Sequence, residues 1–323
     1  MSQPAPSSLP AAEAEDLIAA LDSLIGGEAA AERLIAMGPQ VIPLLERVLL
    51  DGPSRTIAVP RSRAVRILGE LGAWPVLVTY FRQYRRPEDA AVLFAEDGVR
   101  SAAAEQLAQW KSDEVYEVLL EAARQRVTGG LIRALSEFGR AEAIPILFLA
   151  LDDDLCREDA GAALRKMPAA SRDYAVLSLR GAAGAPMSFP ASLCRRRAVL
   201  QLLRDLGAGR EDWPILREYL EDTDADSVIA TAAIGFAIAQ TADDSAIVSA
   251  LFRISRHLNW AQEDEVILLL EEHRDIACEA ARAVAREAEA NGEHPDWLVP
   301  QWRILRRLTG AEIQNPALDR SPT

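Results

Sequence analysis

Three aspartates at alternate positions could provide carboxylate ligands for a cation. Asp222, Asp224 and Asp226 match the first half of a calcium-binding loop, in which oxygen ligands recur at every second residue. Ser227 replaces the glycine of the sixth loop position, and Ala233 replaces the bidentate glutamate of the twelfth. Aspartate directly before a helix also accepts hydrogen bonds from the first backbone N–H groups of that helix. We therefore expect helix capping here and no metal site.

Histidine and cysteine form no recognisable catalytic arrangement. The chain contains His257, His273 and His294, and the free thiols of Cys156, Cys194 and Cys278. No histidine is followed directly by glutamate or by a second histidine four residues later, so no two ligands of this kind share a helix face. A nucleophilic cysteine would need a positioned base, and the histidines all lie towards the C-terminal end. These patterns predict no catalytic residue, no metal and no cofactor.

The charge of the chain bears on the class of partner. The formal net charge is −14, from 49 acidic and 35 basic residues, which disfavours long-range attraction to nucleic acid. Arg82, Arg85 and Arg86 give one helical segment a charge of +3, whereas residues 211–222 sum to −4. A phosphate-binding track needs one sign of charge throughout. We expect a protein partner, with these three arginines among its contacts.

Glycines at a regular spacing organise the elements that carry these residues. Gly38, Gly72, Gly139 and Gly207 are separated by 34, 67 and 68 residues, which is one step and two double steps of about 34. Each glycine ends an apolar helical run, as expected for a left-handed helix stop. Proline then recurs early in the next helical segment, at Pro43, Pro145 and Pro214. A period of this size predicts stacked helical hairpins.

Each repeat is predicted to contain a first helix (A), a tight turn, a second helix (B) and a loop. In the first repeat helix A covers residues 28–37 and helix B residues 40–50, and in the second they cover 61–71 and 75–84. Later A helices are expected to begin near Val99, Thr128, Cys156, Arg195 and Ser227, with turns near Lys111, Gly139, Pro168, Gly207 and Thr241. Leu203 is expected on the buried face of the sixth helix A.

Several of these repeats resemble HEAT repeats, particularly the short kind also found in phycobilin lyase subunits. The resemblance rests on Asp97-Gly98-Val99-Arg100 and on residues 221–232, where Ile229 stands at the usual arginine position. It covers roughly residues 28–255 and implies a right-handed α-solenoid. Since HEAT-like arrays are mostly interaction scaffolds, it also implies binding, without specifying a ligand.

Four arginines occupy equivalent positions in these repeats, namely Arg61, Arg100, Arg157 and Arg196. The resemblance implies that such an arginine bonds an acidic or carbonyl partner in the neighbouring repeat. We expect a structural ladder of this kind, with direct contact to a ligand as the alternative.

Insertions lengthen three loops that follow B helices, at residues 52–60, 86–98 and 181–193. Hairpin geometry places these loops at one edge of the array, where insertions often mark the functional rim. The insertions carry apolar residues that the repeat does not account for: Ile57, Val59, Val92, Leu93, Phe94, Met187 and Phe189. Val92, Leu93 and Phe94 are interpreted as a short extra helix that folds back as a plug. Met187 and Phe189 are the stronger candidates for partner contact.

The sequence thus predicts an all-α protein, an α-solenoid of about seven HEAT-like hairpins with a helical C-terminal cap. Residues 1–12 are expected to be disordered, 13–255 to form the array, 256–310 the cap and 311–323 a flexible tail. The predicted function is that of a non-catalytic scaffold that binds a protein through its concave B-helix face and loop rim. The alternative is a HEAT-like enzyme or a lyase or chaperone subunit, with a cofactor or a damaged nucleobase held in the groove.

Location and assembly are predicted from the same features. The first twelve residues lack a basic region and an apolar core, so we expect no signal peptide. No apolar run approaches the ~20 residues that a membrane-spanning helix needs. We expect a cytoplasmic protein that is monomeric by itself.

Overall fold

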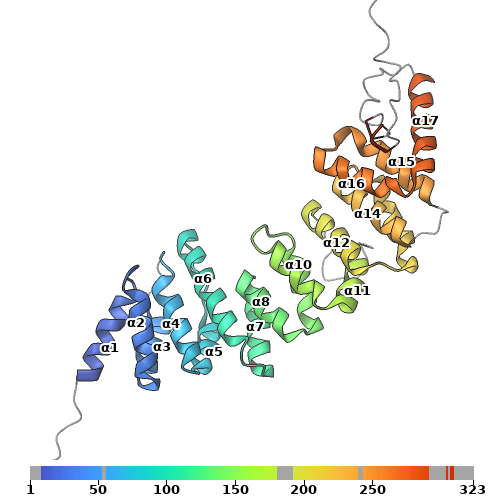
Figure 1. Cartoon of the computed structure of the whole chain (residues 1–323). Helices are drawn as coiled ribbons and strands as arrows, with labels where there is room; N and C mark the ends of the chain where they lie inside the picture. Colours follow the sequence, from blue (N-terminus) through green and yellow to red (C-terminus); the bar gives the residue numbers. More distant parts are fainter. Residues whose placement is uncertain are drawn as a thin grey trace, which may run out of the picture. The chain divides into compact units, whose positions relative to one another are not determined.

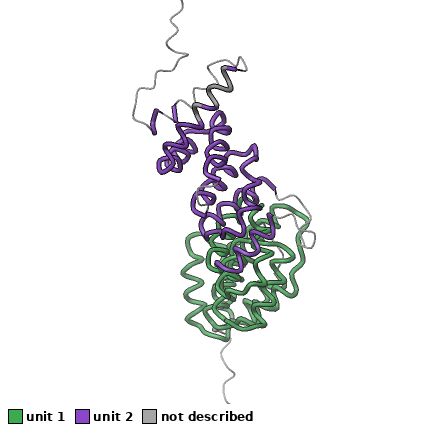
Figure 2. The backbone as a smooth tube through the Cα atoms, turned by 90° about the vertical axis from the view of Figure 1, so that its right-hand side faces the viewer, with its two compact units in different colours: residues 1–167 green, residues 168–323 purple. Residues whose placement is uncertain are grey.

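The chain is all-α wherever its structure is described (Figure 1). The computed structural model describes residues 9–52, 56–179, 192–238, 243–290, 303–304 and 306–308. These residues contain helices and connecting loops but no strand, which confirms the predicted class. The helices form two compact units, Met1–Met167 and Pro168–Thr323 (Figure 2).

Unit 1 alternates between two sets of helices. The A helices are α2 (Gly27–Met37), α4 (Val59–Glu70), α6 (Ala90–Leu107), α8 (Gly129–Phe138) and α10 (Arg157–Arg165). The B helices are α3 (Ile42–Glu46) with its extension η2 (Arg47–Asp51), α5 (Trp74–Gln83), α7 (Asp113–Gln125) and α9 (Ile144–Ala150), and α1 (Leu9–Ala20) precedes the first hairpin. Each A helix packs against the next one, from α2 to α10, and each B helix packs against the A helix that follows it.

Unit 2 repeats this alternation. Its helices are α11 (Pro168–Leu179), α12 (Leu193–Leu206), α13 (Trp213–Leu216) with η5 (Arg217–Glu221), α14 (Ala225–Ile238), α15 (Asp244–Ile254), α16 (Trp260–Glu271) and α17 (Arg274–Ala290). The helices α12, α14 and α16 pack in sequence, and α15 packs against α17. Residues 303–304 and 306–308 are helical as well.

The predicted turn glycines all have a positive φ; Gly139 has the predicted left-handed helical conformation, whereas Gly38 and Gly207 have ψ values of −164° and 125°. Gly38, Gly72, Gly139 and Gly207 have φ values of 81°, 72°, 63° and 80°, a region that side chains with a Cβ rarely adopt. No atom lies within 4 Å of the position that a Cβ would take at any of them. Backbone conformation therefore explains these glycines, and close packing does not. The predicted turn near Thr241 lies outside the described residues.

The core repeats with the same period as the turns. Four residues before each turn glycine stands a leucine, namely Leu34, Leu68, Leu135 and Leu203, and all four are fully buried. Residues four apart lie on one face of a helix, so each A helix buries the same face at its C-terminal end. The burial predicted for Leu203 is thus confirmed.

The prolines that begin the B helices are also confirmed. Pro43, Pro145 and Pro214 are each the second residue of a helix, in α3, α9 and α13. A proline costs little there because its missing N–H would have no partner within the helix.

Two segments differ from their predicted conformation. Helix α1 begins at Leu9, inside the stretch expected to be disordered. Helix α6 begins at Ala90, so Val92, Leu93 and Phe94 form its first turns and are not a separate helix. The reason is the cap: the Asp89 carboxylate accepts hydrogen bonds from the N–H groups of Ala91 and Val92, at 2.9 Å each.

Among the described residues, no helix is long and apolar enough to cross a membrane.

Candidate partner-binding edge

The segments that lead into the A helices of unit 1 lie at one end of the hairpins. Each B helix packs against the A helix that follows it, and successive A helices pack side by side, so the B-to-A connections lie along one edge. We define the loop edge as the described residues 21–26, 52, 56–58, 84–94 and 151–156, which precede or begin α2, α4, α6 and α10.

In the described part of unit 1, large apolar side chains are exposed almost only at this loop edge. Leu24, Ile25, Ile57, Phe94 and Leu155 have exposed fractions of 86%, 97%, 56%, 74% and 82%. Among the described residues of unit 1, Leu149 in α9 is the one other large apolar side chain that is exposed, at 47%. In unit 2, Leu193 and Trp260 are exposed at the first residue of α12 and α16, whereas Leu177 and Leu268 are exposed inside α11 and α16. Apolar exposure therefore follows the starts of A helices in unit 1 but not throughout unit 2.

Arg63 in α4 holds the loop that presents Leu24 and Ile25. Its Nη1 donates to the backbone carbonyls of Leu21 and Ser23, at 2.6 and 2.8 Å, and its Nε donates to Glu28 at 2.8 Å. Gly27 allows this approach, because a Cβ at that position would lie 1.9 Å from Nη1.

Arg157 holds the loop around Leu155 in the same way. Its Nε donates to the carbonyl of Leu151 at 2.9 Å, and its Nη2 lies 2.6 Å from the Asp154 carboxylate. The backbone N–H of Leu155 donates to Asp153 at 2.8 Å. The loop is thus bonded internally while the Leu155 side chain points into solvent. This fixed backbone reduces the ordering cost of binding a partner.

Arg61 joins the end of the first B helix to a buried polar group. Its Nη2 donates to the carbonyl of Leu49 at 2.9 Å, and its Nη1 donates to the Glu96 carboxylate. The other oxygen of Glu96 accepts from the Tyr80 hydroxyl at 2.5 Å. Burial, followed by the charge and the hydrogen bond of Glu96, raises the pKa of Tyr80 well above its usual value.

Arg100 and Arg196 also bind ends of B helices. Arg100 is fully buried, donates to the carbonyls of Ala122 and Arg126 at 2.8 and 3.3 Å, and lies over the Tyr84 ring at 4.0 Å. Arg196 Nε lies 3.0 Å from the carboxylate of Asp222, directly after η5. The last carbonyls of a helix lack partners within it and carry partial negative charge, so a cation is stabilised there.

The basic residues expected to contact a partner lie at or near the loop edge. Arg82, at the end of α5, is exposed and pairs with Glu114 of α7 at 2.8 Å. Arg85 and Arg86 are exposed in the α5–α6 connection, and Arg85 donates to the carbonyl of Tyr84 at 3.1 Å. Arg85 and Arg86 thus lie in the same loop-edge segment as Phe94, and Arg82 lies just before it in α5. Met187 and Phe189 lie outside the described residues.

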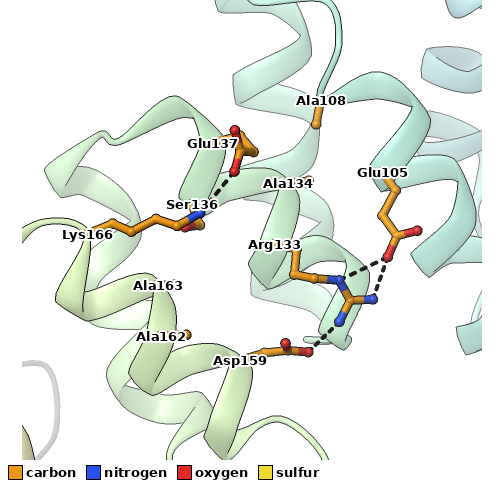
Figure 3. A pocket seen from close by; sticks show the side chains of 10 residues that line it. All are labelled: Glu105, Ala108, Arg133, Ala134, Ser136, Glu137, Asp159, Ala162, Ala163 and Lys166. Atoms are coloured by element: carbon orange, nitrogen blue, oxygen red, sulfur yellow. Dashed lines mark hydrogen bonds and ion pairs between the residues drawn. The ribbon is translucent and has the colours of Figure 1, made fainter.

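A hollow on the outer surface of the A helices has a different character (Figure 3). It has a volume of about 540 Å³ between α6, α8 and α10, with alanines in its floor. Arg133 donates to Glu105 of α6 and to Asp159 of α10, and the bond with Glu105 raises the pKa of Arg133. Lys166 donates to Glu137 at 3.0 Å and lowers the pKa of that carboxyl. The ionic groups of this hollow thus bind one another across neighbouring helices.

The three alternating aspartates act within the protein. Asp224 accepts hydrogen bonds from the N–H and hydroxyl of Ser227, at 3.0 and 2.7 Å, which confirms the predicted cap of α14. Burial alone would raise the pKa of Asp224, but these bonds and Arg197 together lower it. Within the described residues, no group of three histidine, cysteine, aspartate or glutamate side chains is placed to hold a metal ion.

The sequence interpretation did not single out Leu24, Ile25 and Leu155, which are among the most exposed apolar residues. The sequence does contain a feature that predicts their exposure. Leu24 and Ile25 follow Asp22-Ser23, and Leu155 follows Asp152-Asp153-Asp154, so each stands between polar residues and the start of an A helix. Arg63 and its role in holding a loop were missed as well.

Neither the family models nor the curated proteins compared with this chain give a match.

Proposed function

We propose that this chain is a non-catalytic scaffold of HEAT-like helical hairpins, arranged as an α-solenoid, that binds a protein partner through the loop edge. The observation that carries the proposal is the exposure of Leu24, Ile25, Ile57, Phe94 and Leu155 before or at the start of A helices, with the loops of Leu24 and Leu155 held by Arg63 and Arg157. Exposed apolar side chains that cluster on one edge mark interaction surfaces more often than scattered ones do.

The loop edge also has the mixed character of a protein interface. Its apolar side chains are accompanied by Arg85 and Arg86, and arginine is enriched at interfaces. A partner that covers the edges of several hairpins would bury the ~1,200–2,000 Å² typical of stable complexes. Of the two surfaces predicted from the sequence, the B-helix face has one exposed large apolar side chain in the described part of unit 1, Leu149. The loop edge therefore has the stronger support.

The proposal is tested by affinity purification from the cells that express the protein, followed by mass spectrometry. The variant Ile25→Ser, Phe94→Ser, Leu155→Ser removes three apolar anchors without touching the core. Its matched control is Leu149→Ser, an exposed leucine on a B helix. We expect a stoichiometric protein with the native chain and the control, and at least a tenfold loss with the triple variant, since buried apolar anchors carry most binding energy.

Retention of the partner by the triple variant, or its loss with Leu149→Ser alone, would contradict the assignment to the loop edge. A coloured or nucleotide-bearing preparation with no stoichiometric protein would instead support the enzyme or lyase-subunit alternative.

A further inference from the structure

Two adjoining hollows lie beside α1, where the first hairpin of unit 1 begins. The smaller one, about 280 Å³, is lined mainly by apolar groups, including Ile18, Ala19 and Ile57. The larger one, about 460 Å³, is lined by residues of α1, α3 and η2. Both share Ile18, Val48 and Gly52, and we call the pair the α1 groove. Because Ile57 belongs to the loop edge as well, the α1 groove reaches that edge.

The floor of the α1 groove is an unusual turn. The helix η2 is a π-helix, closed by a hydrogen bond from the N–H of Gly52 to the carbonyl of Arg47 at 3.0 Å. A Cβ at position 52 would lie 2.4 Å from the carbonyl oxygen of Val48, so this close turn requires glycine. Single π-helical turns are rare and occur frequently at functional sites.

In the hollow between α6, α8 and α10, the charged side chains pair with one another. Around the α1 groove, most of those among the described residues do not. Glu15, Asp22 and Asp51 are exposed and form no ion pair within the described part of the chain. Arg47 is the one cation of the lining that has no acidic partner among these residues, because Arg61 is paired with Glu96. Among the described lining residues, three carboxylates thus stand against one such cation, so this part of the groove is negative.

We propose that the α1 groove binds an extended segment of the partner protein, with one large apolar side chain in the smaller hollow and lysine or arginine side chains beside Glu15, Asp22 and Asp51. The smaller hollow lies just below the ~300–1,000 Å³ of small-molecule sites, which suits a single anchoring side chain better than a cofactor. The negative rim selects a basic segment by charge complementarity. The inference rests on the proposed scaffold function and specifies the chemistry of the partner at one end of the loop edge.

The test uses the full-length chain and a phage-displayed library of random peptides about twelve residues long, followed by fluorescence anisotropy with the enriched peptides. We expect enriched peptides to combine leucine, phenylalanine or tryptophan with neighbouring lysine or arginine, and to bind with Kd below about 100 μM at low salt. Ala19→Phe fills the smaller hollow and should weaken binding at least tenfold. Ala29→Phe, at an exposed alanine of α2 away from the groove, is the matched control and should leave binding unchanged.

The charge requirement is tested by Asp22→Asn with Asp51→Asn, which should weaken binding about tenfold and reduce its salt dependence, whereas Asp16→Asn on α1 should not. Enrichment of acidic peptides, absence of enrichment, or binding that Ala19→Phe leaves intact would each overturn the α1 groove as the site. Peptides lost with Phe94→Ser and Leu155→Ser, but not with Ala19→Phe, would overturn it while the scaffold function stands. The scaffold function itself fails only in the purification experiment with the native partner.

Discussion

The outer surface of the A helices and the loop edge belong to the same helices of unit 1. They differ in the partners of their charged side chains and in the exposure of their apolar ones. On the outer surface, charged groups pair across neighbouring helices, as in the contacts of Arg66 with Glu28 and Glu32 and of Arg133 with Glu105. At the loop edge, arginines bind backbone carbonyls and the apolar side chains of the loops remain in solvent.

Under the proposed scaffold function, this difference assigns two tasks to different surfaces: the alignment of neighbouring hairpins and the binding of a partner. Ion pairs between successive A helices favour one alignment of neighbours, although each exposed pair contributes only about 0–1 kcal/mol. Arginines that bind loop carbonyls leave the loop side chains free for another molecule. The outer surface therefore completes its interactions within the chain, and the loop edge does not.

The largest expected effect compares two leucines of one hairpin. Leu164 in α10 is fully buried, whereas Leu155 just before α10 is exposed. Leu164→Asp places an unpaired carboxylate in the core and should lower the free energy of unfolding by more than about 3 kcal/mol. Leu155→Asp should change it by less than about 0.5 kcal/mol. Urea denaturation measures both, and similar costs would mean that Leu155 is part of the core.

A smaller effect separates the two roles of arginine. Arg63→Met removes donors to the carbonyls of Leu21 and Ser23 and should cost about 2 kcal/mol, because the part-buried carbonyl of Leu21 loses a hydrogen bond from a charged donor. Arg133→Met removes half-exposed ion pairs and should cost less than about 1 kcal/mol, decreasing further in high salt. Arg63→Met should also speed proteolysis near Leu24. If Arg133→Met proved the costlier change, the stabilising role assigned to loop holding would be wrong.

The smallest effect concerns Cys156, which directly follows the exposed Leu155. Burial raises the pKa of Cys156 to about 11, so only about 0.1% of it is thiolate at pH 8. Iodoacetamide should therefore label the exposed Cys194 more than tenfold faster. Since the fold favours the neutral thiol, this contribution to stability is present below pH 9 and decreases as the pH rises towards 11. Equal labelling rates would show that the loop around Leu155 opens readily.

Much of the hairpin architecture could be predicted because it depends on local chemistry. Gly139 has the residue type that best suits a positive φ, and Pro145 has one that is tolerated in the first turn of a helix but not in its interior, so the sequence marks that turn and the following helix directly. The start of α6 was misplaced because the residues after Asp89 carry no repeat pattern, and the decisive feature is a single capping carboxylate.

The candidate site was less predictable, since it depends on contacts between segments far apart in the sequence. Arg63 reaches loop carbonyls about forty residues earlier in the chain, and no local pattern records such a contact. The exposure of Ile25 follows from that loop geometry, because an isoleucine before a helix is equally compatible with burial.

Photo-crosslinking to the purified partner tests the loop edge as the binding surface most directly. A photoreactive phenylalanine derivative is placed at Ile25, Phe94 or Leu155, and at Leu149 of α9 or Ala162 in the A-helix hollow as controls. The account predicts covalent adducts with the partner from the three loop-edge positions and none from Leu149 or Ala162. Adducts from Leu149 or Ala162, with none from the loop edge, would contradict it.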